Sequence, residues 1–258
     1  MKITCLTENT CKNENFVCEH GLSLFIESDG LRILFDMGQT QLFYENAQRL
    51  GIDLKDVDFA VLSHGHYDHG GGLKKFLEVN KTAPVYMSRF AFEPHYNGTE
   101  KYIGLDTSLK DNKRLIFIED RIEITEKISL FSCNDKARKY DLGSFGLNMK
   151  VNGMFLPDDF RHEQYLMINE NGRRILISGC SHKGIMDITE WFSPDVLVGG
   201  FHYSKIEPGE KLSEYADFLD RFDTEFYTCH CTGVQQYEHM KQHMRNLQYI
   251  SCGDQIEI

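Results

Sequence analysis

The chain has 258 residues, of which 41% are hydrophobic and 26% charged, enough for a single large domain over residues 1–258 with a substantial core. Its net charge is -11 and it has no sustained basic run, so we expect no nucleic-acid partner. No stretch approaches the roughly 20 apolar residues of a membrane-spanning helix, and MKITCLTENT is too polar for a signal peptide. These features predict a cytoplasmic protein whose eight cysteines are mostly free thiols.

The first third of the chain predicts short strands followed by helices. Strands at 22–28 and 32–38 flank an Asp-Gly pair, which is a strong hairpin signal. A helix at 41–51, a buried strand at 58–63 and an amphipathic helix at 73–79 follow. Strands therefore alternate with helices in this part of the chain.

The rest of the chain divides into an irregular and a regular part. Residues 84–135 hold three strand-like pieces, PVYMS, RLIFIE and KISLFS, separated by polar loops that could cover a cleft. Beyond them the pattern predicts a hairpin at 165–179, strands at 195–201 and 225–231, and helices at 184–192, 211–221 and 234–245. This order predicts an α/β (α+β) fold of two mixed sheets packed face to face, with helices outside.

Ligand-type side chains are concentrated in HGHYDHGGGL, at the turn between the strand at 58–63 and the helix at 73–79. In an extended segment, His64 and His66 point to the same side and can meet one ion, whereas Asp68 and His69 follow the turn and can face a second. Imidazole and carboxylate groups bind zinc, although iron, manganese and nickel also accept them. The pattern favours two divalent ions, most simply Zn²⁺, over a polar turn with exposed histidines.

HGHYDH resembles the His-x-His-x-Asp-His signature of the metallo-β-lactamase superfamily. The resemblance implies a four-layer αββα sandwich with the metals at one edge, between the sheets. Further blocks, EHGLSLFIE, ISGCSHKGI, VGGFHYSKI and CHCTG, are similar to a branch that includes 7,8-dihydropterin-6-methyl-4-(β-D-ribofuranosyl)aminobenzene-5'-phosphate synthase. Many members of that branch are described only as metal-dependent hydrolases.

The resemblance also implies metal ligands from the second half of the chain. His230 follows a strand where the superfamily places its last metal histidine, next to the ion of Asp68 and His69. Cys180 occupies the position of a bridging aspartate, and it could bridge the metals or be a small buried residue. We expect His182 to be the third ligand of the ion held by His64 and His66.

Other cysteines and histidines near these blocks receive different interpretations. His162 is a poor match to the histidine block that carries the third ligand in many lactamases. If the strand at 225–231 is extended throughout, Cys229 and Cys231 point away from His230 and are packing residues. His239 and His243 lie four apart on the last helix and are expected at the surface.

Four residues outside the motif are predicted to support the site. Asp36 ends an earlier strand and would orient a metal ligand from behind. His20, His95 and His202 resemble positions kept in the branch and should line the cleft. His202 follows a buried strand and two glycines, which makes it the candidate for proton transfer or for contact with an oxyanion.

The predicted function is hydrolysis of a small ester, lactone, amide or phosphoester by a metal-bound hydroxide, with Asp68 and His202 as catalytic residues. A pterin-coupling transferase is the first alternative. Redox chemistry at two irons is disfavoured, because the oxygen-reducing relatives carry Glu at the position of His66. A noncatalytic metal or ligand sensor is a further alternative. The expected partner is a small-molecule substrate, and a homo-oligomer is possible.

Overall fold

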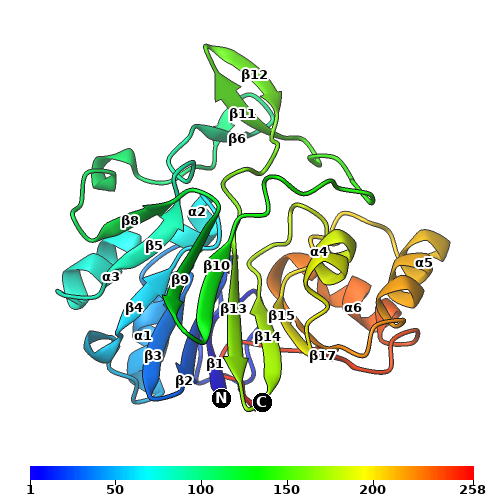
Figure 1. The fold of residues 1–258 in the computed structure, drawn as a ribbon, viewed down its shortest axis with the longest axis horizontal. Helices are drawn as coiled ribbons and strands as arrows, with labels where there is room; N and C mark the ends of the chain where they lie inside the picture. Colours follow the sequence, from blue (N-terminus) through cyan, green and yellow to red (C-terminus); the bar gives the residue numbers. More distant parts are fainter.

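The computed structural model describes residues 1–258 and consists of two seven-stranded sheets packed face to face, a smaller four-stranded sheet, and helices on the outside (Figure 1). This arrangement confirms the predicted four-layer αββα sandwich. No helix is long and apolar enough to cross a membrane.

The first large sheet has the strand order β18-β1-β2-β3-β4-β5-β8. Its strands are β1 (Lys2–Thr7), β2 (Ser23–Ser28), β3 (Leu31–Phe35), β4 (Phe59–Val61), β5 (Val85–Ser88), β8 (Leu115–Ile118) and β18 (Gln255–Glu257). The antiparallel hairpin of β2 and β3 confirms the Asp-Gly prediction, since Asp29 and Gly30 both have the positive φ that a tight hairpin turn requires. From β3 onward, neighbouring strands are parallel, so their carboxyl ends share one edge.

The second large sheet has the order β17-β16-β15-β14-β13-β10-β9. Its strands are β9 (Arg121–Thr125), β10 (Ile128–Phe131), β13 (Tyr165–Glu170), β14 (Arg173–Ile177), β15 (Val196–Gly199), β16 (Glu225–Thr228) and β17 (Leu247–Tyr249). The predicted hairpin is present as β13 and β14, and the four strands from β14 to β17 are parallel.

Because side chains alternate along each strand, apolar residues form three buried layers, one between the two large sheets and one between each sheet and its helices. On β14, Ile175 and Ile177 enter the core between the sheets, whereas Leu176 enters the core under the helices. The first sheet is covered by α1 (Leu42–Arg49) and α3 (Leu73–Val79), with the short 3₁₀ helix η1 (Leu54–Asp56) between them in the chain. The second sheet is covered by α4 (Ile185–Phe192), α5 (Glu210–Leu219) and α6 (Val234–Met240). The last helix is shorter than predicted, because turns replace it after Met240.

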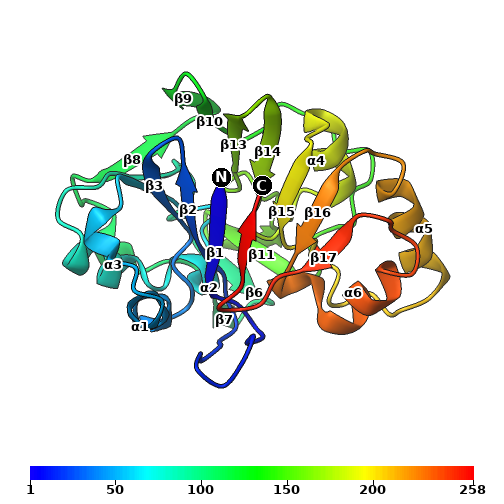
Figure 2. The same cartoon turned by 90° about the horizontal axis from the view of Figure 1, so that it is seen from below.

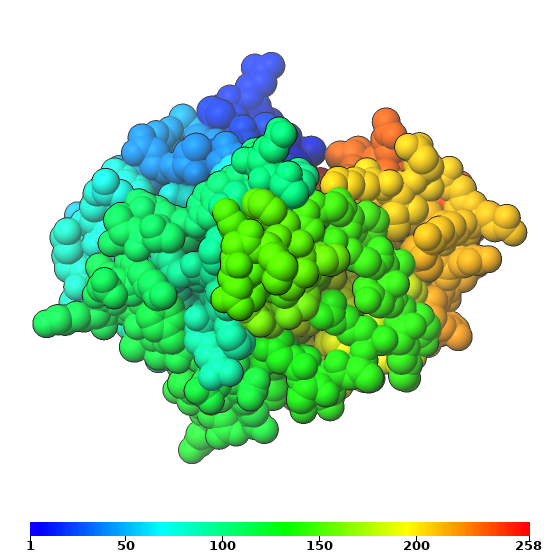
Figure 3. Space-filling model, turned by 90° about the horizontal axis from the view of Figure 1, so that it is seen from above, coloured from blue at the N-terminus to red at the C-terminus, as the bar shows by residue number.

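The small sheet lies above one end of the sandwich (Figure 1) and has the order β12-β11-β6-β7. Its strands are β6 (His95–Asn97), β7 (Lys101–Tyr102), β11 (Leu147–Val151) and β12 (Met154–Pro157), and the 3₁₀ helix η2 (Thr107–Leu109) follows β7. Figure 3 shows the green middle of the chain spread over this end, between the blue and cyan first half and the yellow and orange second half. The chain termini lie side by side at the opposite end (Figure 2), where the Met1 amino group donates to the Ile258 carbonyl oxygen at 3.1 Å.

Candidate metal centre

A cavity of about 250 Å³ opens where the edges of the two large sheets meet the small sheet. Its wall includes seven of the residues that the sequence singled out: His20, His66, Asp68, Cys180, His182, His202 and His230. His64 and His69 are fully buried behind them. The helix α2 (Tyr67–Gly70), a single turn, carries the centre of the HGHYDH motif to this edge.

Strained backbone marks the strand ends that supply these side chains. Asp36, Ser181, His202 and His230 all have left-handed φ values, between 51° and 58°, just beyond β3, β14, β15 and β16. Non-glycine residues adopt this conformation at a cost of about 1–3 kcal/mol each, and such residues concentrate at functional sites. The tight turns aim side chains from four strands at the same volume.

The first donor group consists of His64, His66 and His182, whose donor atoms lie within 4.8 Å of one another. The Nε2 atoms of His64 and His182 are 3.3 Å apart. The Ser63 hydroxyl donates to the Asp36 carboxylate at 2.7 Å, so it accepts from Nδ1 of His64 at 2.8 Å. The Nε2 atom of His64 therefore keeps a free lone pair that faces His182.

The second donor group consists of Asp68, His69, His230 and Cys180. Nδ1 of His69 donates to Asp36 at 2.7 Å, which leaves its Nε2 atom 3.2 Å from Nε2 of His230 and 3.1 Å from the Cys180 sulfur. Nε2 of His230 is also 3.5 Å from the Asp68 carboxylate. The Cys180 sulfur lies within 4.8 Å of donor atoms from both His64 and His69, and hence between the two groups.

The spacing of these nitrogens fits a metal ion. With zinc-nitrogen bonds of 2.0–2.1 Å, two imidazoles on one tetrahedral ion place their nitrogens about 3.3 Å apart. The two Nε2 pairs, at 3.2 and 3.3 Å, match that value. Nitrogen lone pairs facing each other at this distance repel unless a proton or a cation lies between them, so both groups suit a divalent ion.

Burial keeps four of the donor imidazoles in the neutral state that binds metal. It lowers the pKa of His64, His66 and His182 well below the usual value, and it lowers the pKa of His230 to about 4. Neutral imidazole is the form that binds an ion. Burial would raise the pKa of Asp68, but the hydrogen bond from His20 and the neighbouring His230 and His69 rings hold it well below its usual value.

The Asp36 carboxylate favours a positive charge at the second donor group, the one that contains His69. Burial alone would lower the pKa of His69, but the Asp36 carboxylate outweighs it and raises that pKa. A metal ion at Nε2 of His69 would take the place of the proton that Asp36 favours there. Asp36 thus lies where the sequence predicted it, behind a candidate ligand.

Two residues that the sequence did not single out hold His230 from the opposite half of the chain. Glu8 accepts from the backbone N–H of His230 at 2.6 Å, and Asn9 accepts from its Nδ1 at 2.7 Å. The Asn9 amide also donates to Nδ1 of His20 at 3.3 Å, so that Nε2 of His20 donates to Asp68 at 3.2 Å. Asn9 therefore sets opposite tautomers on the two histidines.

Replacing Asn9 by alanine should weaken metal binding about 10–100-fold, the usual cost of losing the partner that orients a ligand. Nδ1 of His230 would lose its acceptor, and its ring would no longer be held with Nε2 toward His69. Competition with a chelator measures the affinity. Asn15→Ala, at an exposed position of the same loop, is the control. Equal affinities in both variants would contradict the role of Asn9.

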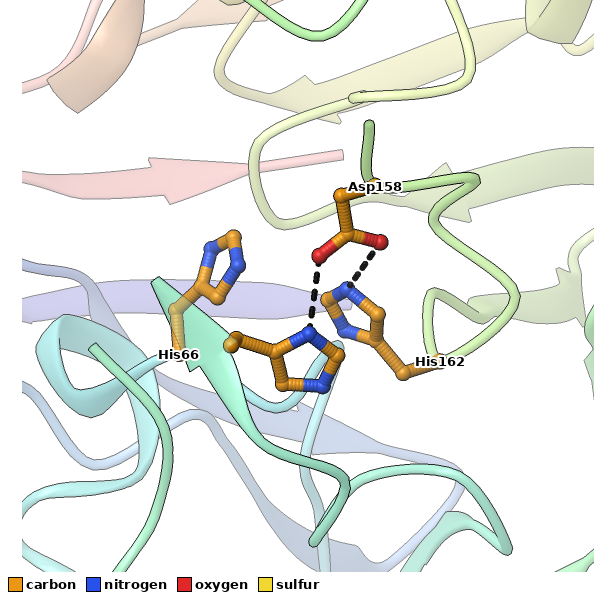
Figure 4. A group of neighbouring side chains, drawn as sticks. His66, Asp158 and His162 are labelled. Carbon is orange, nitrogen blue, oxygen red and sulfur yellow. Dashed lines mark hydrogen bonds and ion pairs between the residues drawn. The ribbon is translucent and has the colours of Figure 1, made fainter. Parts of the chain in front are cut away.

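A third cluster lies beside His66 and contains His95, Asp158 and His162 (Figure 4). Its donor atoms are close enough to hold a metal ion. However, the Gly65 N–H donates to Nδ1 of His162 at 2.9 Å, so the proton of the neutral ring is on Nε2, which faces Asp158 at 3.4 Å. Asp158 also accepts from Nδ1 of His95 at 2.8 Å. Through the Gly65 N–H, this pattern ties the cluster to the backbone between His64 and His66.

Two residues lie elsewhere than expected at this site. His95 does not line the cavity, because the Asp158 carboxylate holds it fully buried in the third cluster. Cys231 does not point away from His230, because residues His230–Thr232 form the 3₁₀ helix η3 rather than extended chain. Its sulfur lies within 4.8 Å of the donor atoms of Cys180 and His230. Cys229, in contrast, packs in the core between the sheets, as predicted.

His202 is where the sequence placed it, on the cavity wall, with its ring centroid 4.3 Å from that of His182. Burial lowers its pKa to about 4, so at neutral pH it is an unprotonated base. His239 and His243 lie outside the site, where they bond Ser213 and Asp217.

An αββα sandwich with converging histidines at the sheet edge defines a metallo-β-lactamase-type protein, and the family model described as "Metallo-beta-lactamase superfamily" matches residues 17–219. The chain belongs to this superfamily. It is 31% identical to the 7,8-dihydropterin-6-methyl-4-(beta-D-ribofuranosyl)-aminobenzene-5'-phosphate synthase of Methanocaldococcus jannaschii, over 91% of this chain and 88% of that protein. An uncharacterised protein of the same organism is 30% identical over 99% of this chain and 100% of its own length.

Solved structures show the same fold. The crystal structure of a metal-dependent hydrolase of the beta-lactamase superfamily matches 100% of this chain and 99% of that chain, with a TM-score of 0.85 and 29% identity. Zinc-bound PqqB from Methylobacterium extorquens matches 100% of both chains with a TM-score of 0.59, but at 13% identity this likeness concerns the fold alone.

Proposed function

We propose that this protein is a metal-dependent hydrolase with two divalent ions, most simply zinc, acting on a small ester, lactone, amide or phosphoester. The observation that carries the proposal is the convergence of imidazole Nε2 atoms at 3.2 and 3.3 Å, with the Nδ1 atoms of His64, His69 and His230 bonded away from the gap. His64, His66 and His182 would hold one ion. Asp68, His69 and His230 would hold the other, with Cys180 between the two.

The protein groups around these positions would have distinct roles. A divalent ion held by these residues would lower the pKa of a bound water to about 7 and would polarise a substrate oxygen. Asp68 is ionised, accepts from His20 and can hold a proton-bearing group in place. His202 is neutral and lines the cavity, so it can accept a proton or donate a hydrogen bond to an oxyanion.

Metal-dependent turnover on a substrate panel tests the proposal. The full chain would be stripped with a chelator, reloaded with zinc, manganese or ferrous iron, and assayed on aryl esters, lactones, amides and bis(p-nitrophenyl) phosphate. We expect turnover only after reloading, with a lower kcat in His202→Ala. Metal-replete protein that is inert on every class would contradict hydrolysis and would favour a noncatalytic metal or ligand sensor.

A second candidate, the coupling of a dihydropterin to an aminobenzene ribofuranosyl phosphate, is favoured by the 31% identity to the named synthase. In this reaction the metal positions would organise a diphosphate leaving group rather than activate water. Incubating the metal-loaded protein with a dihydropterin diphosphate and the aromatic amine distinguishes the two reactions. Coupled product in the mass spectrum would support synthesis, and hydrolysed diphosphate alone would support the hydrolase.

The same proposal includes a small-molecule substrate, a cytoplasmic location and no nucleic-acid partner. The cavity of about 250 Å³ is of a size for a small molecule rather than a polymer, and the net charge of -11 disfavours binding to a phosphate backbone.

A further inference from the structure

Two cysteine thiols, those of Cys180 and Cys231, lie together in the wall of the cavity. We propose that both supply thiolate to the second metal position, which is then a mixed imidazole and sulfur site that selects zinc and similar thiophilic ions over manganese or magnesium. The inference rests on the metal-binding part of the proposed function and is independent of whether the protein hydrolyses or couples its substrate.

The positions of the two sulfur atoms point to one ion. The Cys180 sulfur is 3.1 Å from Nε2 of His69, and that nitrogen is 3.2 Å from Nε2 of His230. The Cys231 sulfur lies within 4.8 Å of the donor atoms of both Cys180 and His230. The Cys180 thiol therefore lies within reach of both His69 and His230, and the Cys231 thiol lies within reach of His230. Imidazole nitrogen and thiolate sulfur are donors typical of zinc.

The backbone is shaped to bring Cys231 there. Strand β16 ends at Thr228, and His230, with its left-handed φ, is the first residue of η3. This change of direction turns the Cys231 side chain toward the cavity. Gly200, on the loop after β15, leaves room for it, because a Cβ at that position would lie 2.4 Å from the Cys231 sulfur. That sulfur makes a weak contact of 3.5 Å with the Cys180 carbonyl oxygen. A metal would be a stronger partner.

Charge balance supports sulfur ligation at the second position. The first position has only neutral imidazoles, from His64, His66 and His182, whereas the second has the Asp68 carboxylate. Each thiol releases its proton to solvent when it binds an ion. With two thiolates and one carboxylate, three negative charges offset the four positive charges of two divalent ions in a buried site, where uncompensated charge is costly.

X-ray absorption at the zinc edge tests the proposal on the full chain loaded with zinc. We expect a sulfur shell at about 2.3 Å beside the nitrogen shell at about 2.0–2.1 Å. The sulfur shell should weaken in Cys231→Ser and disappear in the Cys180→Ser, Cys231→Ser double variant. Cys133→Ser, a half-buried cysteine outside the cavity, should leave it unchanged. An unchanged sulfur shell in Cys231→Ser would overturn the assignment of Cys231.

Two further measurements do not depend on the folding of a variant or on activity. In the wild-type protein, zinc should protect both Cys180 and Cys231 from alkylation, read by peptide mass spectrometry, and equal labelling of Cys231 with and without zinc would overturn the proposal. Zinc should also displace manganese from the second position.

Loss of turnover with the sulfur shell present would reject the hydrolase alone, and turnover without a sulfur shell would reject the thiolate site alone.

Discussion

Replacing His64 by alanine should remove the ion from the first position and lower metal-dependent turnover by more than about 100-fold. Losing a residue that merely orients a ligand costs about 10–100-fold in metal affinity, so losing one of three ligand imidazoles should cost more. No neighbouring histidine can replace the lost imidazole, because Nδ1 of His162 already accepts from the Gly65 N–H. Metal content by elemental analysis and kcat/KM for the best substrate of the panel measure the two effects.

His239→Ala is the matched control, because this histidine is on α6 and bonds Ser213 on α5, away from the cavity. It should keep both ions and full turnover. If His64→Ala retained two ions per chain, or turned over substrate at the rate of the control, the assignment of the first metal position would be wrong. Loss of one ion with turnover intact would show that the second position alone carries the chemistry.

The sequence predicted those parts of the fold whose pattern is local. The Asp-Gly pair between two strands specifies a tight hairpin, and the structure has that hairpin as β2 and β3. Leu73–Val79 has helical spacing and forms α3 over the predicted residues. The end of α6 was missed because apolar spacing continues to Met244, which packs in the core under the helices from irregular chain rather than from a helix.

The sequence predicted the candidate ligands because the spacing of their histidine and aspartate side chains indicates a metal site. His64, His66, Asp68 and His69 come from one short segment, and the structure brings His182 to them across the sandwich. Their role as metal ligands stays a prediction. What the structure adds is that their ring nitrogens face the same gaps.

Residues that act through contacts distant in sequence were missed. Glu8 and Asn9 meet His230 across more than two hundred residues of chain, and nothing in their neighbourhood marks them. Glu163 is similar, since it accepts from the backbone N–H of His182 at 2.6 Å. Cys231 was misplaced for another reason, because the alternation rule that pointed it outward holds for a strand and fails in η3.

Replacing Asp36 by alanine should lower the free energy of unfolding of the metal-free protein by about 3–9 kcal/mol and abolish metal binding at the second position. The carboxylate is fully buried and accepts three hydrogen bonds of 2.7 Å, from the Ser63 N–H, the Ser63 hydroxyl and Nδ1 of His69. Each buried donor left without a partner costs about 1–3 kcal/mol. Chemical denaturation and zinc competition with a chelator measure the two effects.

Asp36→Asn separates orientation from packing. Asparagine has the size of aspartate and tolerates the left-handed φ of 58° at this position. It can accept from Ser63 through its oxygen, but its NH₂ group would face Nδ1 of His69 and favour the tautomer with the proton on Nε2, where the metal should bind. We therefore expect a smaller loss of stability than in the alanine variant but an equal loss of zinc at the second position. Wild-type zinc affinity in Asp36→Asn would show that His69 needs no anionic partner to bind the ion.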